Sequence, residues 1–124
     1  MANYYNTTGS FGSTGIKTTT CGFQPIGIRV TISSKGGETY THFSQGQADN
    51  SGYTTCHAFI QDTTGGKTVK FAGNNGQIAS VWERVSGTLT EVFAATFDSF
   101  TATAGKINVT TANSNYQCNI ELWD

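Results

Sequence analysis

The clearest pattern along this chain is the alternation of apolar and polar residues in two short runs. In residues 26–32, IGIRVTI, an isoleucine or valine occupies every second position, and Gly27, Arg29 and Thr31 lie between them. The run at 116–123, YQCNIELW, repeats the pattern, with its tryptophan on the polar side. Alternation with a period of two predicts strands that bury one face, whereas no segment has the periodicity of a convincing helix.

Six further runs have strand character, and clusters of glycine, asparagine and serine separate them. They are 38–46, 53–61, 67–72, 77–85, 88–97 and 104–110. Short strands with turn residues between them are typical of an antiparallel sandwich or barrel. The sequence therefore predicts an all-β protein, an antiparallel β-sandwich of about eight strands in a single domain over residues 16–124.

The residues ahead of this domain have a different composition. Residues 1–15, MANYYNTTGSFGSTG, are mostly glycine, serine, threonine and asparagine and show no period. Such a segment on its own is a flexible arm. Its aromatic residues, Tyr4, Tyr5 and Phe11, indicate that the arm docks on another surface. We predict that this surface belongs to a neighbouring subunit. Pro25, the only proline, precedes the first alternating run, where a residue without an N–H is tolerated, so its role is structural.

The charge and the apolar content exclude several classes of partner. Only 12% of the residues are charged, and the formal net charge is −1, which gives no electrostatic reason to bind nucleic acid or anionic membranes. No apolar run approaches the length of a membrane span, and the first residues lack the pattern of a signal peptide. We therefore expect synthesis in a cytosol, no nucleic-acid partner and no membrane insertion.

The three cysteines and two histidines do not form a recognisable reactive motif. Cys21, Cys56 and Cys118 are odd in number and far apart, and we interpret them as reduced thiols, with one disulfide as the alternative. No pair has the spacing of a metal site. His42 and His57 lie on different expected strands, and no serine lies in a nucleophile-placing turn. The sequence predicts no enzyme activity, no cofactor and no metal.

Carbohydrate binding is the chemistry that best matches this composition of aromatic, amide and hydroxyl side chains. Asp49 and Tyr53 flank the NSG turn and are candidate ligand-binding residues. Trp82 and Arg84 share one face of the run QIASVWERV and are the other candidates. One register of this run buries Ile78 and Trp82, and the other turns Trp82 and Arg84 outward but puts a glutamate inside. The sequence leaves both registers open.

Three stretches carry a resemblance to known proteins. They are an opening TGIKTTTCGFQPIGIRVTI, with a GFxP-like entry to an aliphatic strand, a middle HFSQGQADNSG, and a closing VFAATFDSFTATAGKINVTTANSNYQCNIELW. Together they resemble the small β-sandwich domains of bacteriophage virion proteins, such as tail fibres and head or neck appendages. The layout is also similar to that of the H-type lectins, which assemble as trimers and bind N-acetylgalactosamine-like sugars. Ser99 stands where the virion domains often have glycine, and no residue matches the sugar ligands of the lectins.

The resemblance implies a jelly-roll or H-type-lectin-like sandwich and a non-enzymatic role. The implied protein is a structural or adhesive virion component, a homotrimer that contacts a host glycan or another virion protein. It would be made in a host cytoplasm and located in the virion, or otherwise on an extracellular surface. Two alternatives are a soluble lectin with a defined sugar pocket and a self-assembling filament subunit whose arm adds to a neighbour's sheet.

Overall fold

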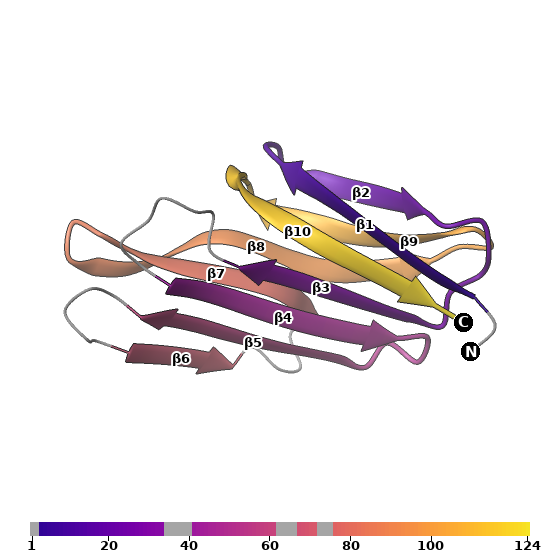
Figure 1. Ribbon diagram of the computed structural model, residues 1–124, viewed down its shortest axis with the longest axis horizontal. Helices are drawn as coiled ribbons and strands as arrows, with labels where there is room; N and C mark the ends of the chain where they lie inside the picture. Colours follow the sequence, from indigo (N-terminus) through magenta and orange to yellow (C-terminus); the bar gives the residue numbers. More distant parts are fainter. Residues whose placement is uncertain (1–2, 34–40, 62–66, 72–75) are drawn as a thin grey trace.

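The computed structural model describes residues 3–33, 41–61, 67–71 and 76–124, with the backbone alone for residues 41, 42, 61, 67–71 and 84. This part of the chain contains no helix (Figure 1). Its ten strands are β1 (Tyr4–Phe11), β2 (Gly15–Thr20), β3 (Gly27–Ser33), β4 (Thr41–Asp49), β5 (Thr54–Gln61), β6 (Lys67–Phe71), β7 (Gln77–Val85), β8 (Thr88–Phe100), β9 (Ala104–Thr111) and β10 (Asn113–Trp123).

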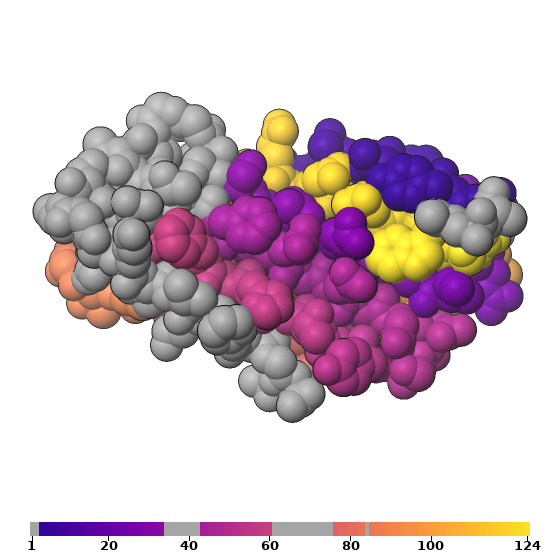
Figure 2. Space-filling view, turned by 60° about the horizontal axis from the view of Figure 1, so that its bottom comes forward, coloured from indigo at the N-terminus to yellow at the C-terminus, as the bar shows by residue number. Residues whose placement is uncertain are grey.

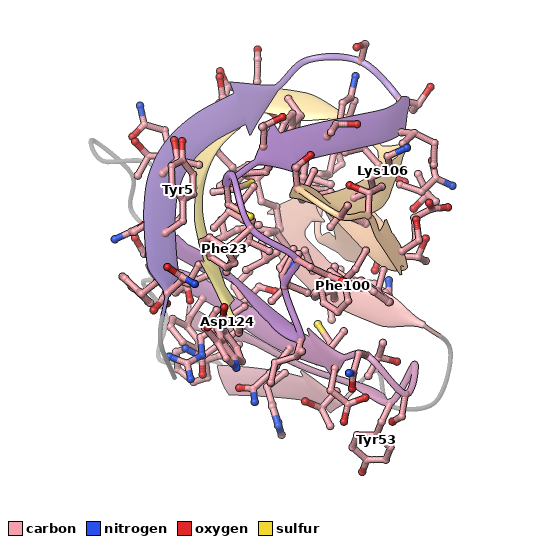
Figure 3. The ribbon with its side chains drawn as sticks, turned by 90° about the vertical axis from the view of Figure 1, so that its right-hand side faces the viewer. Tyr5, Phe23, Tyr53, Phe100, Lys106 and Asp124 are labelled. Carbon is pink, nitrogen blue, oxygen red and sulfur yellow. The ribbon has the colours of Figure 1, made fainter. Side chains whose placement is uncertain are left out.

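The strands form two antiparallel sheets, which confirms the predicted β-sandwich. One sheet has six strands in the order β1-β10-β3-β4-β5-β6, and the other has four in the order β2-β9-β8-β7. Figure 3 shows the sandwich from one end, where Phe23 and Phe100 lie between the two sheets. The prediction of about eight strands differs from the ten observed because β1 and β2 were not expected as strands.

The two alternating runs of the sequence form two neighbouring interior strands of the six-stranded sheet. β3 and β10 lie side by side, with Val30 opposite Ile120 and Ile28 opposite Leu122. All four of these side chains are buried, because their common face packs against the four-stranded sheet. The rest of the buried apolar core comes mainly from β7, β8 and β9 and includes Ile78, Val81, Phe93, Ile107 and Val109.

β1 corrects the expectation that residues 1–15 form a flexible arm. It pairs antiparallel with β10 in continuous register, from Tyr4 opposite Trp123 to Ser10 opposite Gln117, with a bulge only at Phe11. The two ends of the described chain meet here as well (Figure 1), because Asn3 donates from its backbone and side-chain nitrogens to the Asp124 carboxylate at 2.8 and 2.7 Å. Residues 4–11 are therefore part of the sandwich.

The inner face of β1 explains why this strand was not evident from the sequence. Tyr5 and Phe11 pack against the core from this face, so neither is a free docking residue in the folded chain. The inward positions between them are Thr7 and Gly9. These two residues interrupt the apolar pattern that marks a strand, although the burial along β1 alternates with period two.

The cysteines are free thiols, as the composition suggested. Cys56 and Cys118 are buried, and Cys21 is half-buried with its thiol donating to the carbonyl of Phe23 at 3.1 Å. Burial raises the pKa of Cys56, and it raises the pKa of Cys118 from 9.0 to about 12. Both buried thiols therefore stay protonated at neutral pH and behave as small core side chains.

Candidate functional site

Strand pairing brings together four side chains that are far apart in the sequence. β10 lies between β1 and β3, with Tyr4 opposite Trp123 on one side and Arg29 opposite Glu121 on the other. Directly opposed residues of antiparallel strands share a face, so all four side chains project from the outer face of the six-stranded sheet. We call Tyr4, Arg29, Glu121 and Trp123 the outer-face cluster.

The cluster is held by a chain of polar contacts centred on Glu121. The Tyr4 hydroxyl donates to Glu121 Oε2 at 2.8 Å, and Arg29 Nη1 lies 3.6 Å from Glu121 Oε1. The Arg29 guanidinium carbon is also 5.6 Å from the centre of the Trp123 ring, a cation–π distance. Each side chain is thereby oriented by another member of the cluster.

Trp123 takes its position from the glycine opposite it. A Cβ atom built on Gly27 would lie 2.2 Å from Cε2 of the indole, so the ring occupies the space that a side chain would fill. An aromatic ring lying over a cross-strand glycine is a recurring way to cover exposed sheet backbone. Gly27 therefore leaves room for the indole against the backbone of β3, where the Arg29 guanidinium lies over the ring.

The four side chains line a shallow hollow of about 190 Å³. Tyr4 is 53% exposed, and the side chains of Arg29 and Glu121 are 37% and 17% exposed. Ion pairs near a protein surface typically contribute about 0–1 kcal/mol to stability, so this pair is a small part of what holds the fold. The hydrogen bond to Glu121 raises the pKa of Tyr4, which keeps the phenol in its neutral, hydrogen-bonding form.

The surface around the cluster is covered by amides and hydroxyls. Arg29 Nε donates to Gln47 Oε1 at 3.4 Å, and Gln45 Nε2 donates to Thr31 Oγ1 at 3.3 Å. Figure 2 shows this face, on which β1 (indigo), β10 (yellow), β3 (purple) and β4 (magenta) lie side by side. The register places further polar residues on it, namely Asn6, Thr8, Ser10, Gln117, Asn119 and Thr55.

This arrangement provides two different kinds of contact for a ligand. The Tyr4 ring and the part of the Trp123 indole that Gly27 and Arg29 leave uncovered offer apolar area, and the guanidinium, carboxylate and phenol offer directed hydrogen bonds. Ligand sites are mostly apolar hollows with a few polar groups that fix orientation, and the cluster has this composition. A sugar ring, apolar on one face and hydroxylated at its edge, is the kind of ligand that uses both.

Asp49 and Tyr53, two of the residues predicted from the sequence, lie at the β4–β5 turn. The carboxylate of Asp49 accepts hydrogen bonds from the Ser51 backbone and hydroxyl at 2.9 and 2.6 Å and from Tyr53 N at 3.2 Å. The Ser51 hydroxyl is the main cause of its lowered pKa. Asp49 is therefore engaged in holding the turn, and Tyr53, 63% exposed, projects from the end of the sandwich (Figure 3). A hollow of about 140 Å³ lies beside them.

Trp82 and Arg84, the other predicted pair, lie in β7 of the opposite sheet. The pairing of β7 with β8 shifts register between Gln77 and Ala79 and again between Val81 and Trp82. Neither of the two registers considered for the run QIASVWERV therefore holds along the whole strand. Such an irregularity changes the direction in which the neighbouring side chains point. Trp82 is half-buried, and its Nε1 donates a hydrogen bond to Ser80 Oγ at 2.7 Å. The Arg84 side chain is outside the described residues. The four predicted residues thus belong to two separate regions.

The members of the candidate site that sequence reasoning missed are Arg29, Glu121 and Trp123. The alternation had placed all three on the polar side of their strands, and a tryptophan in an outward position was a signal of exposed aromatic surface. Their meeting with Tyr4 depends on β10 lying between β1 and β3, which the sequence alone does not specify. Tyr4, predicted as an assembly residue, is observed as a member of this cluster.

A second, larger hollow of about 430 Å³ opens at the end of the sandwich. Its lining is Gln24, Pro25, Ile26, Asn50, Ser51, Gly52, Phe97, Ser99 and Phe100. Ile26 is 45% exposed here and not buried with the rest of its alternating run, because it precedes the first residue of β3. The lining carries no charged side chain, so it offers a ligand fewer strong contacts than the outer-face cluster does.

Of the two histidines considered for a reactive site, the structure describes the side chain of one. His57 is exposed in β5, opposite Gln45 of β4, and the side chain of His42 is outside the described residues. The described residues also contain no group of three or more histidine, cysteine, aspartate and glutamate side chains placed to hold a metal.

Comparison of the chain with protein-family models, with curated proteins and with solved structures finds no match. The likeness to virion sandwiches and H-type lectins therefore stays a prediction. Among the described residues there is also no helix long and apolar enough to span a membrane.

Proposed function

We propose that this protein is a non-enzymatic adhesive β-sandwich that binds glycans through the outer face of its six-stranded sheet. The observation that carries the proposal is the outer-face cluster, in which two aromatic residues lie beside an ion-paired arginine and glutamate. The amides and hydroxyls around it would extend the contact along an oligosaccharide. Because such a chain is longer than one sugar ring, we expect it to cross β1, β10, β3 and β4.

The setting of this activity is the one that the resemblance implies. We propose that the protein is part of a virion appendage or a similar surface assembly, where a rigid sandwich presents a glycan-binding face to a host surface. A free lectin with the same face is the alternative. Finding the protein in purified particles of its source would favour the appendage, and finding it only as a free protein would favour the lectin.

Binding of an oligosaccharide panel to the full chain tests the glycan proposal. We expect at least one member to bind saturably, and Tyr4→Ala to weaken it by about tenfold or more, equal to about 1.4 kcal/mol. Tyr53→Ala is the matched control, because Tyr53 is at least as exposed but lies outside the cluster. Tyr4→Phe keeps the ring and removes the hydroxyl, so it separates stacking from the hydrogen bond to Glu121.

Two results would contradict this assignment. If none of the panel binds while circular dichroism shows folded protein, the glycan proposal is wrong. If Tyr53→Ala abolishes binding and Tyr4→Ala does not, the sugar site lies at the β4–β5 turn and not at the outer-face cluster.

A further inference from the structure

The four strands at the ends of the two sheets differ in how they are protected from pairing with another chain. β1 and β6 end the six-stranded sheet, and β2 and β7 end the four-stranded one. An edge strand offers unpaired backbone N–H and C=O groups, and natural proteins commonly block such edges with charged residues, prolines or bulges. β2 contains Lys17, β6 contains Lys67 and Lys70, and β7 contains Glu83 and Arg84.

β1 lacks the charged residues and the proline, and its one register shift lies near its end, between Ser10 and Phe11. Its sequence, YYNTTGSF, has no charged residue and no proline. It runs in regular register against β10 for seven residues, Tyr4–Ser10, before the bulge at Phe11. Among the described strands, β10 is the one that pairs with it. The other side of β1 is therefore an uncharged edge that can accept one more strand.

We propose that this edge pairs with β1 of a second copy of the chain, antiparallel, to form a symmetric dimer. A second copy suits the edge because β1 is neutral and the whole chain has a net charge of −1, so neither copy repels the other strongly. The exposed side chains Asn6, Thr8 and Ser10 add hydrogen-bonding groups, and cross-strand pairs of this kind stabilise antiparallel sheets. Pairing the same strand from both copies closes the assembly at two.

The dimer would join two six-stranded sheets into one continuous sheet with a common outer face. In a register centred on Thr7, Tyr4 lies opposite Ser10 of the partner subunit. The two Tyr4 residues are then six positions apart along the strands, about 20 Å at about 3.3 Å per residue. If the outer-face cluster binds glycans, as proposed above, the dimer presents two sites on one face and gains avidity for a repeating ligand. The pairing itself does not depend on that function.

Charge placed on β1 tests the pairing in the full chain. Thr8→Lys puts two like charges near each other across the proposed contact, and Thr88→Lys makes the same change in an exposed residue of β8, in the β7–β8 hairpin (Figure 1). Native mass spectrometry and sedimentation should give a dimer for the unmodified chain and for Thr88→Lys, and a monomer for Thr8→Lys. Thr8→Asp should also be a monomer, and mixing it with Thr8→Lys should restore a dimer.

Two observations distinguish a folding defect from lost pairing. The circular dichroism spectrum shows whether each variant is folded, and an unfolded variant could not form a dimer when the Thr8→Lys and Thr8→Asp proteins are mixed. A monomeric unmodified chain at all concentrations overturns the proposal, as does a dimer that survives Thr8→Lys or a mixture that stays monomeric. A trimer, which the resemblance implies, overturns it too, because an antiparallel β1 pair joins two copies. Loss of glycan binding in a variant that still dimerises would concern the proposed function alone.

Discussion

The backbone of Gly46 in β4 lies directly against the carbonyl group of Ile78 in β7. A Cβ atom built on Gly46 would be 1.7 Å from the Ile78 oxygen and 2.3 Å from its carbon. The atoms that the Cβ would meet belong to the backbone of Ile78, so they cannot move aside as the end of a flexible side chain could. The two sheets of the sandwich therefore come into backbone contact at a position where one strand has no side chain.

Gly46→Ala should accordingly destabilise the protein strongly. Overpacking of a filled interior costs about 1–3 kcal/mol, and this contact lies at the upper end of that range because a backbone segment must shift. Urea unfolding of the variant measures the loss. Gly9→Ala in β1 is the matched control, since a Cβ there meets no atom within 4 Å. Equal stability of the two variants would contradict the close approach of the sheets.

The same region contains a buried hydrogen bond between the sheets. The backbone N–H of Ser80 in β7 donates to the Ser44 hydroxyl in β4 at 2.9 Å, and both serines are buried. Ser44→Ala leaves that N–H without its acceptor, at a cost of about 1–3 kcal/mol. Ser33→Ala, an exposed position at the end of β3, should change the free energy of unfolding by much less. A Ser44→Ala protein as stable as the control would show that the bond is replaceable.

The stability of the protein should fall at alkaline pH. The Cys118 thiol ionises near pH 9 in the unfolded chain, but burial raises its pKa to about 12 in the folded protein. Between these values the folded state holds more protons, so the free energy of unfolding falls as pH rises, by up to about 1.4 kcal/mol per pH unit for this group. Burial, with a hydrogen bond to Glu83, also raises the pKa of Tyr116 and adds to the loss above about pH 10.

Urea unfolding from about pH 8 to about pH 11 measures this slope. Cys118→Ala removes the thiol and should make the slope shallower, whatever its effect on stability at neutral pH. An identical slope in the two proteins would mean that Cys118 ionises equally easily in both states.

The three thiols should differ in reactivity in the native protein. Cys56 and Cys118 are buried and their pKa values are raised, so neither supplies accessible thiolate, whereas Cys21 is half-buried. Mass spectrometry after a short exposure to iodoacetamide should find Cys21 modified first. Modification of all three at one rate would indicate that the sandwich opens globally on that timescale.

Gly27→Ala should disturb the outer-face cluster without unfolding the protein. The added Cβ would collide with the Trp123 indole, which can swing outward because it lies on the surface. We expect a shift in tryptophan fluorescence and weakened glycan binding, with the unfolding midpoint nearly unchanged. Gly12→Ala, where a Cβ meets Ser114 at an ordinary 3.4 Å, is the control. Unchanged fluorescence would mean that the ring keeps its place despite the added atom.

The sequence predicts strands well where one face is uniformly apolar and poorly where it is not. β3 and β10 were evident because Ile28, Val30 and Ile120 alternate with polar residues, and the structure buries all three. In β2, Ile16 is 50% exposed while Lys17 is half-buried. The apolar residue is thus on the outer face and the charged residue on the inner face, the reverse of the usual pattern. An edge strand can carry such a reversal because few side chains cover it.

Bulges limit what periodicity can show within the strands that were found. β8 shifts register between Ala94 and Ala95 and between Phe97 and Ser99, and β7 shifts beside Trp82. Each shift breaks the two-residue period, so no single register of QIASVWERV could be right. The candidate site was beyond sequence reasoning for another reason, because it depends on which strands are neighbours and not on any one strand.

The place of β10 in the sheet also determines when this protein can fold. Among the described strands β10 comes last in sequence, yet it lies between β1 and β3, and its Glu121 accepts a hydrogen bond from a tyrosine 117 positions earlier. Until β10 has emerged from the ribosome, β1 and β3 lack the strand that pairs with both of them. Pairing over such separations slows folding to milliseconds or seconds. We expect the nascent chain to remain incompletely folded and aggregation-prone until β10 has been synthesised and has emerged from the ribosome.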